Sequence, residues 1–363
     1  MAFPKANTLR LNLALQGGGA HGAYTWGVLD ELLTCDVLAL DTVSGTSAGA
    51  VNAVAVASGL AQGGPERARE VLRGVWEAVV EAGRRDRTPL NPFAAGLRGM
   101  EMLAGGQFAR LAGTMSPYEF NPLDINPLRT ILTTHIDFPA VKDAPLSLAI
   151  AATDVETGLA RIFERDEIDL DVVLASACLP AISQAVEIDG RYYWDGGFSA
   201  NPDLLSFARL SRTQDTLLVL VSPLVQPGVP QRPQEIAGAM SRLTFNQPLM
   251  RDLWLIDAVR RARGLKLRAQ STIERLASHR FHLLDGGQHT GALPLDSKLV
   301  PDPEHVTTLY EAGCADARAW LDEKAQHVGW RETADFEALF GTTGTLNEPH
   351  GAVAVTPAAG KAS

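Results

Sequence analysis

The sequence has few cysteines, and they lie far apart. Only Cys35, Cys178 and Cys314 occur in 363 residues, and no C-x-x-C pair is present. An odd, scattered set argues against a disulfide framework and against a zinc knuckle. We therefore expect reduced thiols, a cytoplasmic protein and no bound metal.

Long apolar runs are also lacking. The longest stretch with little charge, residues 47–62, is too short to span a bilayer and consists mostly of Ala, Gly and Val. The first ten residues, MAFPKANTLR, lack the apolar segment of a signal peptide. Any membrane contact is therefore expected to be peripheral, at the inner membrane face.

Positive charge is in deficit. The formal net charge is -10 at pH 7, and the sequence pI is about 5.3. A nucleic-acid backbone binds basic surfaces, so this balance argues against nucleic acid as a main partner. Hydrophobic residues make up 46% and charged residues 20% of the chain, which is typical of a globular protein with a large core.

The sequence does contain a regular alternation of strand-like and helix-like segments. This alternation predicts an α/β fold with a parallel sheet. The apolar patterns predict strands at 8–16, 39–44, 146–153, 159–164, 216–224 and 280–285, a hairpin at 183–194, and helices at 22–34, 48–60, 65–83, 127–136, 169–178, 232–278 and 302–325.

A glycine-rich turn joins the first expected strand to the first helix. Gly17, Gly19 and Gly22 form the pattern G-x-G-x-x-G, which often binds a dinucleotide. That use requires an acidic residue at the end of the second strand, whereas Asp36 and Asp41 precede or start it. A nucleotide-binding or regulatory module is therefore kept only as an alternative.

The second expected strand ends in a G-x-S-x-G pattern. Gly45, Ser47 and Gly49 lie between this strand and a helix rich in small residues. Such a strand–turn–helix junction is typical of a nucleophile elbow, which presents a serine hydroxyl at the positive end of a helix. Ser47 is the candidate nucleophile.

A serine nucleophile needs a base. If this base is a histidine, the protein is a triad esterase of the α/β-hydrolase type, which stays an alternative. No downstream histidine lies in a distinctive sequence context. The candidates are His135, His279, His282, His289, His305 and His327.

A carboxylate that is shielded from water can also act as the base. Asp195 follows an aromatic segment and precedes Gly196 and Gly197, although a hairpin turn at Asp-Gly would give the same pattern. Asp285 also precedes two glycines. It lies in the helix-rich C-terminal part, away from the layers expected to carry Ser47, and we interpret it as a turn.

Taken in order, these motifs resemble those of the patatin-like phospholipase family. The matching segments are GGGAHG at 17–22, GTSAG at 45–49, ATDVETG at 152–158, ASACLP at 175–180 and DGG at 195–197. The similarity extends from about residue 10 to residue 208. It implies a three-layer α/β/α fold with a mostly parallel sheet, a Ser–Asp dyad without a catalytic histidine, and no cofactor.

The resemblance also implies the roles of individual residues. Ser47 would be the nucleophile and Asp195 the proton acceptor. The turn at Gly17, Gly18 and Gly19 would form the oxyanion hole, with motif support from Gly22, Gly45, Gly49, Gly196 and Gly197. The N–H groups of Gly18 and Gly19 would then stabilise a tetrahedral intermediate. The implied activity is hydrolysis of carboxylic esters of lipids, of the phospholipase A type.

This chain departs from the family's pattern at His21, where the family often has Arg or Lys. A fixed positive charge beside the turn is therefore in question, because histidine titrates near neutral pH.

The resemblance defines a catalytic domain over residues 10–208, with a sheet that can extend to about residue 224. We expect a mainly helical C-terminal extension over 225–340 and a disordered tail over 341–363. The extension would cover the site, form an oligomer or determine substrate choice. Residues 84–124 mix Pro, Gly and large apolar side chains, a composition that fits a lid and also fits part of the core.

Overall fold

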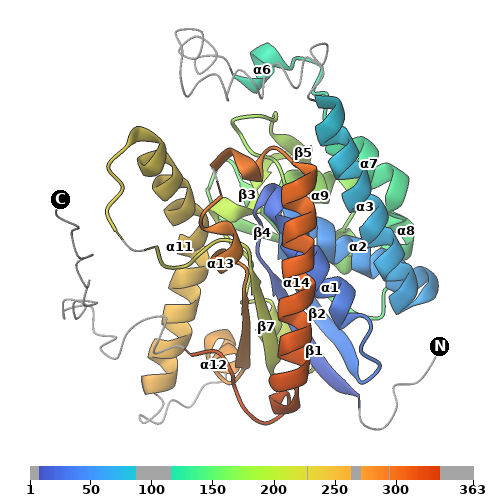
Figure 1. Ribbon diagram of the computed structural model, residues 1–363, viewed down its shortest axis with the longest axis vertical. Helices are drawn as coiled ribbons and strands as arrows, with labels where there is room; N and C mark the ends of the chain where they lie inside the picture. The colour runs from blue at the N-terminus through green and yellow to red at the C-terminus, as the bar shows by residue number, and fades with distance from the viewer. Residues whose placement is uncertain (1–7, 87–115, 227, 263–270, 294, 336–363) are drawn as a thin grey trace, which may run out of the picture.

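The computed structural model describes residues 8–86, 116–226, 228–262, 271–293 and 295–335. The middle of the molecule is an eight-stranded sheet in the order β5-β6-β3-β2-β1-β7-β8, with β4 paired to β3 (Figure 1). Its strands are β1 (Leu9–Leu15), β2 (Leu38–Thr46), β3 (Ser147–Asp154), β4 (Ala160–Glu164), β5 (Val186–Ile188), β6 (Arg191–Asp195), β7 (Asp215–Leu220) and β8 (Arg280–Asp285).

The sheet is parallel from β3 through β2, β1 and β7 to β8, and its other pairs are antiparallel. The helices are α1 (Gly22–Leu32), α2 (Ala48–Gly63), α3 (Pro65–Asp86), α6 (Pro117–Phe120), α7 (Pro127–His135), α8 (Phe138–Val141), α9 (Leu170–Ser176), α10 (Phe207–Leu210), α11 (Pro233–Ala262), α12 (Thr272–Ala277), α13 (Gly287–Thr290) and α14 (Pro303–Glu323). These elements confirm the mixed α/β fold that the sequence predicts.

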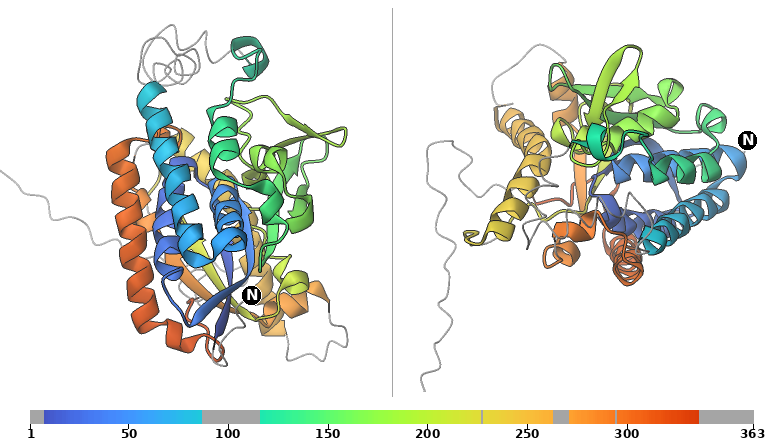
Figure 2. Two further views of the ribbon diagram at one scale, coloured as in Figure 1. Left: turned by 90° about the vertical axis from the view of Figure 1, so that its right-hand side faces the viewer. Right: turned by 90° about the horizontal axis from the view of Figure 1, so that it is seen from above.

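Alternate residues of β1 face two different cores, as the period of a strand requires. Leu11, Leu13 and Leu15 belong to a large core that also holds side chains of α1, α2, α3 and α14. Ala14 points to the other face, where it joins a smaller core with side chains of α10, α11 and α12. Helices therefore cover both faces of the sheet, and α11 lies on the side away from α3 (Figure 1, Figure 2).

The C-terminal part of the chain is more closely tied to the sheet than the sequence indicates. The expected extension over 225–340 is rich in helix, but it also contributes β8, which pairs in parallel with β7. The placement of Asp285 away from the α/β layers is therefore wrong, because Asp285 ends a strand of the same sheet. A division of the chain near residue 208 stays a prediction.

Two expectations fall mainly outside the described residues. The segment 84–124 is described only at its ends, where α3 finishes at Asp86 and α6 begins at Pro117. The tail over 341–363 is not described. None of the helices in the described ranges combines the length and the apolarity that a membrane span requires.

Candidate active site

Ser47 occupies a strained turn between β2 and α2. Its backbone has φ 55° and ψ -122°, a conformation that costs energy for a residue with a Cβ. Ser47 is the residue just before α2, so its side chain lies at the positive end of that helix. A Cβ on Gly49 would overlap the carbonyl oxygen of Leu15, which explains why this turn is built from small residues.

The register of the sheet brings Asp195 level with Ser47. Thr46 pairs with Ala151 on β3, and the next residue of β3, Ala152, pairs with Asp195 on β6. Ser47 and Asp195 are thus two strand spacings apart, roughly 9.5 Å between their backbones. Two side chains can span this gap, and the Ser47 hydroxyl lies close enough to Asp195 to lower the pKa of its carboxyl group.

Asp195 is almost fully buried, with an exposed fraction of 1%. Its Oδ1 accepts a hydrogen bond of 2.7 Å from the N–H of Gly197. Burial raises its pKa to about 7, while the hydrogen bond from Gly197 and the nearby hydroxyl of Ser47 act in the opposite direction. A carboxyl group with this pKa can both accept and release a proton near neutral pH. Ser47 itself is half-buried, so it is more accessible than its partner.

Asp195 does not lie in a hairpin turn, which was the alternative explanation for its Asp-Gly sequence. The turn between β5 and β6 is made by Asp189 and Gly190, which have φ values of 52° and 77°. Asp195 instead ends β6 and leads into a short 3₁₀-helix, η3 (Gly196–Phe198). Its backbone is fixed by Cys178, whose carbonyl accepts the Asp195 N–H at 2.7 Å.

In the glycine turn after β1, two of the three N–H groups have no acceptor among the described residues. The N–H of Gly17 donates to Asn201 Oδ1 at 2.7 Å, so it is already used. The N–H groups of Gly18 and Gly19 have no hydrogen-bond partner in the described part of the chain, and both residues are half-buried. Gly19 has φ 58°, and a Cβ there would overlap the carbonyl oxygen of Lys298.

His21 does not supply a positive charge beside this turn. It is 2% exposed, and its Nε2 lies 2.7 Å from Ser297 Oγ. Burial, followed by the positive charges of Lys298 and His305, lowers its pKa to about 3. His21 is therefore neutral at pH 7.

Three contacts at the site were not predicted from the sequence, although one of them comes from the ASACLP segment. Ser176 accepts the N–H of Ser47 at its Oγ, 2.9 Å away, and so holds the turn from the ASACLP segment. Asn201 binds both Gly17 and the carbonyl of Phe245, which links the glycine turn to α11. The ring of Phe245 covers Gly197, where a Cβ would overlap it. Only the position of Asn201 just after the DGG motif could have drawn attention to it.

Asp285 has nearly the same local geometry as Asp195. It ends β8, and its Oδ1 accepts the N–H of Gly287 at 2.9 Å, two residues further on. Burial raises its pKa as well. The strand order places β8 three spacings from β2, roughly 14 Å, so Asp285 is far from Ser47.

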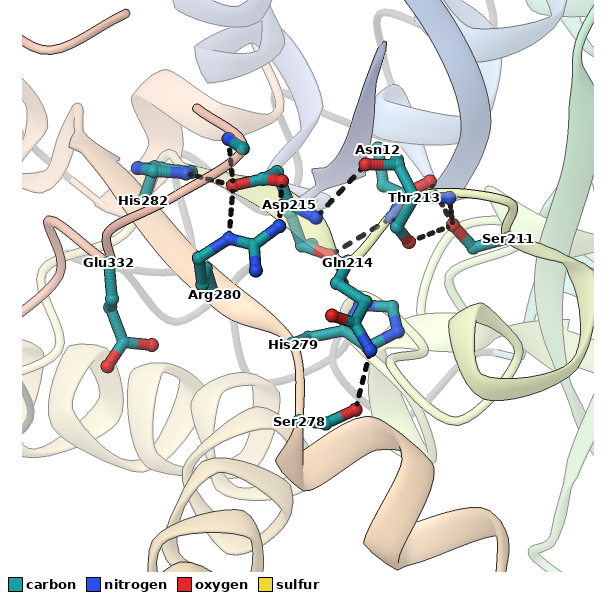
Figure 3. Close-up of polar contacts among 12 residues, drawn as sticks. Asn12, Ser211, Thr213, Gln214, Asp215, Ser278, His279, Arg280, His282 and Glu332 are labelled. Carbon is teal, nitrogen blue, oxygen red and sulfur yellow. Dashed lines mark hydrogen bonds and ion pairs between the residues drawn. The ribbon is translucent and has the colours of Figure 1, made fainter. Parts of the chain in front are cut away.

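The histidine with the most buried carboxylate partner lies toward the other end of the sheet. His282 Nε2 lies 3.2 Å from Asp215 Oδ1, and Figure 3 shows Asp215 between His282 and the guanidinium group of Arg280. In the sheet, Val219 on β7 is level with Leu15 on β1, which is level with Gly45 near the end of β2. Asp215 is the first residue of β7 and lies four positions before Val219. This separation is about 13 Å along the strands. The pair therefore cannot complete a triad with Ser47.

Three further histidines also contact residues other than Ser47. His279 Nδ1 lies 3.0 Å from Thr216 Oγ1, and His289 Nε2 lies 2.9 Å from Asp316 Oδ2. His327 Nε2 accepts from Arg331. In these contacts, none of the three imidazole rings is directed toward Ser47.

The acidic residue needed for nucleotide binding is misplaced, as the sequence indicates. Asp41 lies near the start of β2, where it binds Arg10 and the N–H of Arg212. Asp41 lies four residues before Gly45, so it is about 13 Å away from the C-terminal end of β2, where Ser47 follows. Among the described residues there is also no group of three or more His, Cys, Asp or Glu side chains arranged to hold a metal ion.

Residues 13–208 match the family model described as patatin-like phospholipase. The sequence has no significant match among curated proteins. Among solved structures, the chain is similar to VipD from Legionella pneumophila, with a TM-score of 0.41 and 15% identity over 88% of this chain and 67% of that chain. It is also similar to the structure of full-length SpcU in complex with full-length ExoU from the type III secretion system of Pseudomonas aeruginosa. The TM-score there is 0.24, with 13% identity over 92% of this chain and 76% of that chain. The family match spans more than half of the 363 residues.

Proposed function

The chain belongs to the patatin-like phospholipase family, and we propose that it hydrolyses carboxylic esters of lipids with Ser47 as the nucleophile and Asp195 as the base. The observation that carries this proposal is the placement of the Ser47 hydroxyl, on a strained turn, next to the buried carboxyl group of Asp195. Beside this pair lie the N–H groups of Gly18 and Gly19, which have no partner among the described residues.

The first half of the reaction transfers the acyl group to the enzyme. Asp195 accepts the proton of the Ser47 hydroxyl while Ser47 Oγ attacks the ester carbonyl carbon. The carbonyl oxygen becomes an oxyanion, which the N–H groups of Gly18 and Gly19 stabilise. The intermediate then expels the alcohol oxygen, which takes the proton from Asp195, and an acyl-enzyme on Ser47 remains.

The second half returns the enzyme to its starting state. Asp195 accepts a proton from water, and the resulting hydroxide attacks the acyl carbon. A second oxyanion forms in the same place, Ser47 leaves with the proton from Asp195, and the fatty acid is released. A buried carboxyl group with a pKa near 7 suits both proton transfers, because it binds and releases the proton at similar cost.

We further propose that the enzyme meets its substrate by peripheral contact with a lipid surface. Ile236, Met240 and Leu243 are spaced on one stripe of α11, with exposed fractions of 42%, 65% and 64%. The same helix supplies Phe245 to the site. An exposed apolar stripe on a helix that contacts the site through its opposite face favours shallow insertion among lipid headgroups.

The activity is tested by turnover of a fluorogenic phospholipid in mixed micelles. Wild-type protein should release fatty acid, and Ser47→Ala should lower kcat by a factor on the order of 10⁴ or more while the protein stays folded by circular dichroism. Equal rates for the two proteins would contradict the proposal.

A further inference from the structure

Two adjacent residues of α11 contact different parts of the proposed active site. Phe245 is half-buried and its ring lies over Gly197, which follows the base by two residues. Asn246 is 4% exposed and binds Gln16, which directly precedes the turn that carries the proposed oxyanion donors. One step of a single helix therefore touches both halves of the site.

The ring of Phe245 takes the place of water beside the carboxyl group of Asp195. A Cβ placed on Gly197 would lie 2.3 Å from Phe245 Cδ1 and 2.9 Å from Asp195 Oδ1. The ring atom and the carboxyl oxygen are therefore no farther apart than the sum of these two distances. The ring of Phe198 packs on that of Phe245, with 4.9 Å between their centroids. Removing water from a carboxyl group disfavours its ionised form, so this ring favours the protonated acid.

The polar groups next to the Asp195 carboxyl group, within the described part of the chain, are uncharged at neutral pH. They are the N–H of Gly197, the hydroxyl of Ser47 and the thiol of Cys178. Burial, followed by the charge of Asp195, raises the pKa of this thiol to about 12, so it stays protonated. Exposure to water therefore decides how readily Asp195 takes up a proton.

Two buried amide side chains connect α11 to the glycine turn. Asn246 Oδ1 accepts from Gln16 Nε2 at 3.1 Å. The carbonyl of Phe245 accepts from Asn201 Nδ2 at 3.0 Å, and Asn201 Oδ1 accepts the N–H of Gly17 at 2.7 Å. Consecutive residues of α11 are thus bound to the start of the turn, where Gln16 and Gly17 are also consecutive.

We propose that Phe245 and Asn246 are positioning residues for the hydrolysis: the Phe245 ring keeps water from the Asp195 carboxyl group, and Asn246 holds the glycine turn in place. This inference rests on the proposed function and adds to it a helix that lies outside the matched residues 13–208. Each of the two residues acts through a neighbour, Gly197 or Gln16, and not on the substrate.

The first test follows kcat/KM on a neutral soluble ester as the pH is varied, in a series of truncations of Phe245. The wild-type rate should have its midpoint near pH 7. A smaller side chain admits more water to Asp195, so the midpoint should fall by less than about 0.5 pH unit in Phe245→Leu and by roughly 1 to 2 pH units in Phe245→Ala. Phe245→Val should lie between them, and it provides the same test if Phe245→Ala does not fold. Gln247→Ala, at an exposed residue directly after Asn246, should keep the wild-type midpoint.

The second test measures kcat and KM of Asn246→Ala at pH 8, with kcat expressed per active site titrated by a fluorophosphonate probe. The variant leaves Gln16 Nε2 without its acceptor and loosens the turn. The oxyanion donors then act less well in the transition state, so kcat should fall roughly tenfold while KM changes by less than about twofold. Its pH midpoint should stay at the wild-type value, because Asn246 binds the turn and not the base.

The outcomes separate these roles from the activity itself. If wild-type protein cleaves the ester with a midpoint near pH 7 and Phe245→Ala keeps that midpoint, the role of Phe245 is overturned while the hydrolase stands. If Asn246→Ala changes KM alone, or changes neither constant, its role is overturned in the same way. If Ser47→Ala retains the wild-type rate, the proposed function fails, and this inference fails with it.

Discussion

The side chain of Ser47 lies close to the carboxyl group of Asp195 and lowers its pKa, although about 150 positions separate the two residues in the chain. The sheet register explains this meeting, because β3 lies between β2 and β6 and aligns the two residues across its own Ala152. The pair combines an accessible hydroxyl on a strained turn with a carboxyl group that is 1% exposed. The fold thereby holds the proposed nucleophile, which is accessible, against a proposed base that is shielded from water.

The pH dependence of turnover should report the ionisation of Asp195. Burial raises its pKa to about 7, and only the ionised carboxylate can accept the proton of Ser47. We expect kcat/KM on a neutral soluble ester to fall about tenfold per pH unit below pH 7 and to level off above it. A rate that stays constant between pH 5 and pH 8 would contradict the assignment of Asp195 as the base.

Replacing Asp195 by Asn should stabilise the folded protein above neutral pH. The carboxyl pKa rises from its ordinary value of 3.8 to about 7 in the folded protein, so the folded state binds the proton more tightly than the unfolded state. The stability of wild-type protein therefore declines as pH rises from about 4 to about 7, and Asn lacks this cost. The gain of Asp195→Asn in unfolding free energy should be larger at pH 8 than at pH 5, by roughly 2 to 3 kcal/mol. Denaturant titrations at the two pH values test it, and an equal gain at both would be inconsistent.

Gly19→Ala should damage the glycine turn. The new Cβ would meet the carbonyl oxygen of Lys298, and φ 58° is strained for alanine. Misplacing an oxyanion donor costs on the order of 10²–10³ in kcat. Gly64→Ala is the matched control, because Gly64 has φ 81° with nothing within 4 Å of its added Cβ. It should share the backbone strain and keep its activity, and equal losses in the two variants would argue against a role for the turn.

The network around Asp215 should act on stability rather than on turnover. Asp215 binds Arg280, His282 and the N–H of Gly329, and these hydrogen bonds hold its pKa well below the usual range despite burial. Asp215→Ala leaves His282 and Arg280 without their partner, which should cost roughly 3 kcal/mol in unfolding free energy. Asp166→Ala, at an exposed residue, should change it by less than about 0.5 kcal/mol. If the folded Asp215 variant loses turnover completely, His282 belongs to the chemistry after all.

The exposed stripe of α11 should govern association with lipid. Met240→Glu combined with Leu243→Glu places two charges on it and should release the protein from sedimenting neutral vesicles. Val37→Glu is the control, since Val37 is 56% exposed just before β2, at the opposite end of the sheet from Ser47. Unchanged sedimentation of the double variant would place lipid contact elsewhere.

Local patterns were enough to predict most elements of the fold and both members of the proposed dyad. The small residues around Ser47 and the glycines after Asp195 are demanded by close backbone contacts, so they leave a visible trace in the sequence. The context of Asp285 could not be predicted in this way. Its strand joins the sheet through pairing with β7, which depends on residues 60 or more positions away.

The contacts that α11 and the short 3₁₀-helix η4 (Leu295–Lys298) make at the site could not be predicted for a related reason. No sequence motif identifies Phe245, Asn246 or Lys298. These residues reach the site only because α11 and η4 pack over the C-terminal ends of the strands. Likewise, the engagement of Gly17 by Asn201 restricts the proposed oxyanion donors to Gly18 and Gly19, a restriction that no spacing rule conveys.

Labelling with a fluorophosphonate probe at pH 7.5, followed by peptide mass spectrometry, tests the Ser47–Asp195 dyad most directly. We expect one adduct, on Ser47, and a labelling rate at least 10²-fold lower in Asp195→Asn because the hydroxyl then lacks its base. Asp285→Asn, which alters the nearly identical turn at the end of β8, should label at the wild-type rate. An adduct on another residue, or equal labelling of Asp195→Asn and wild-type protein, would contradict the Ser47–Asp195 dyad.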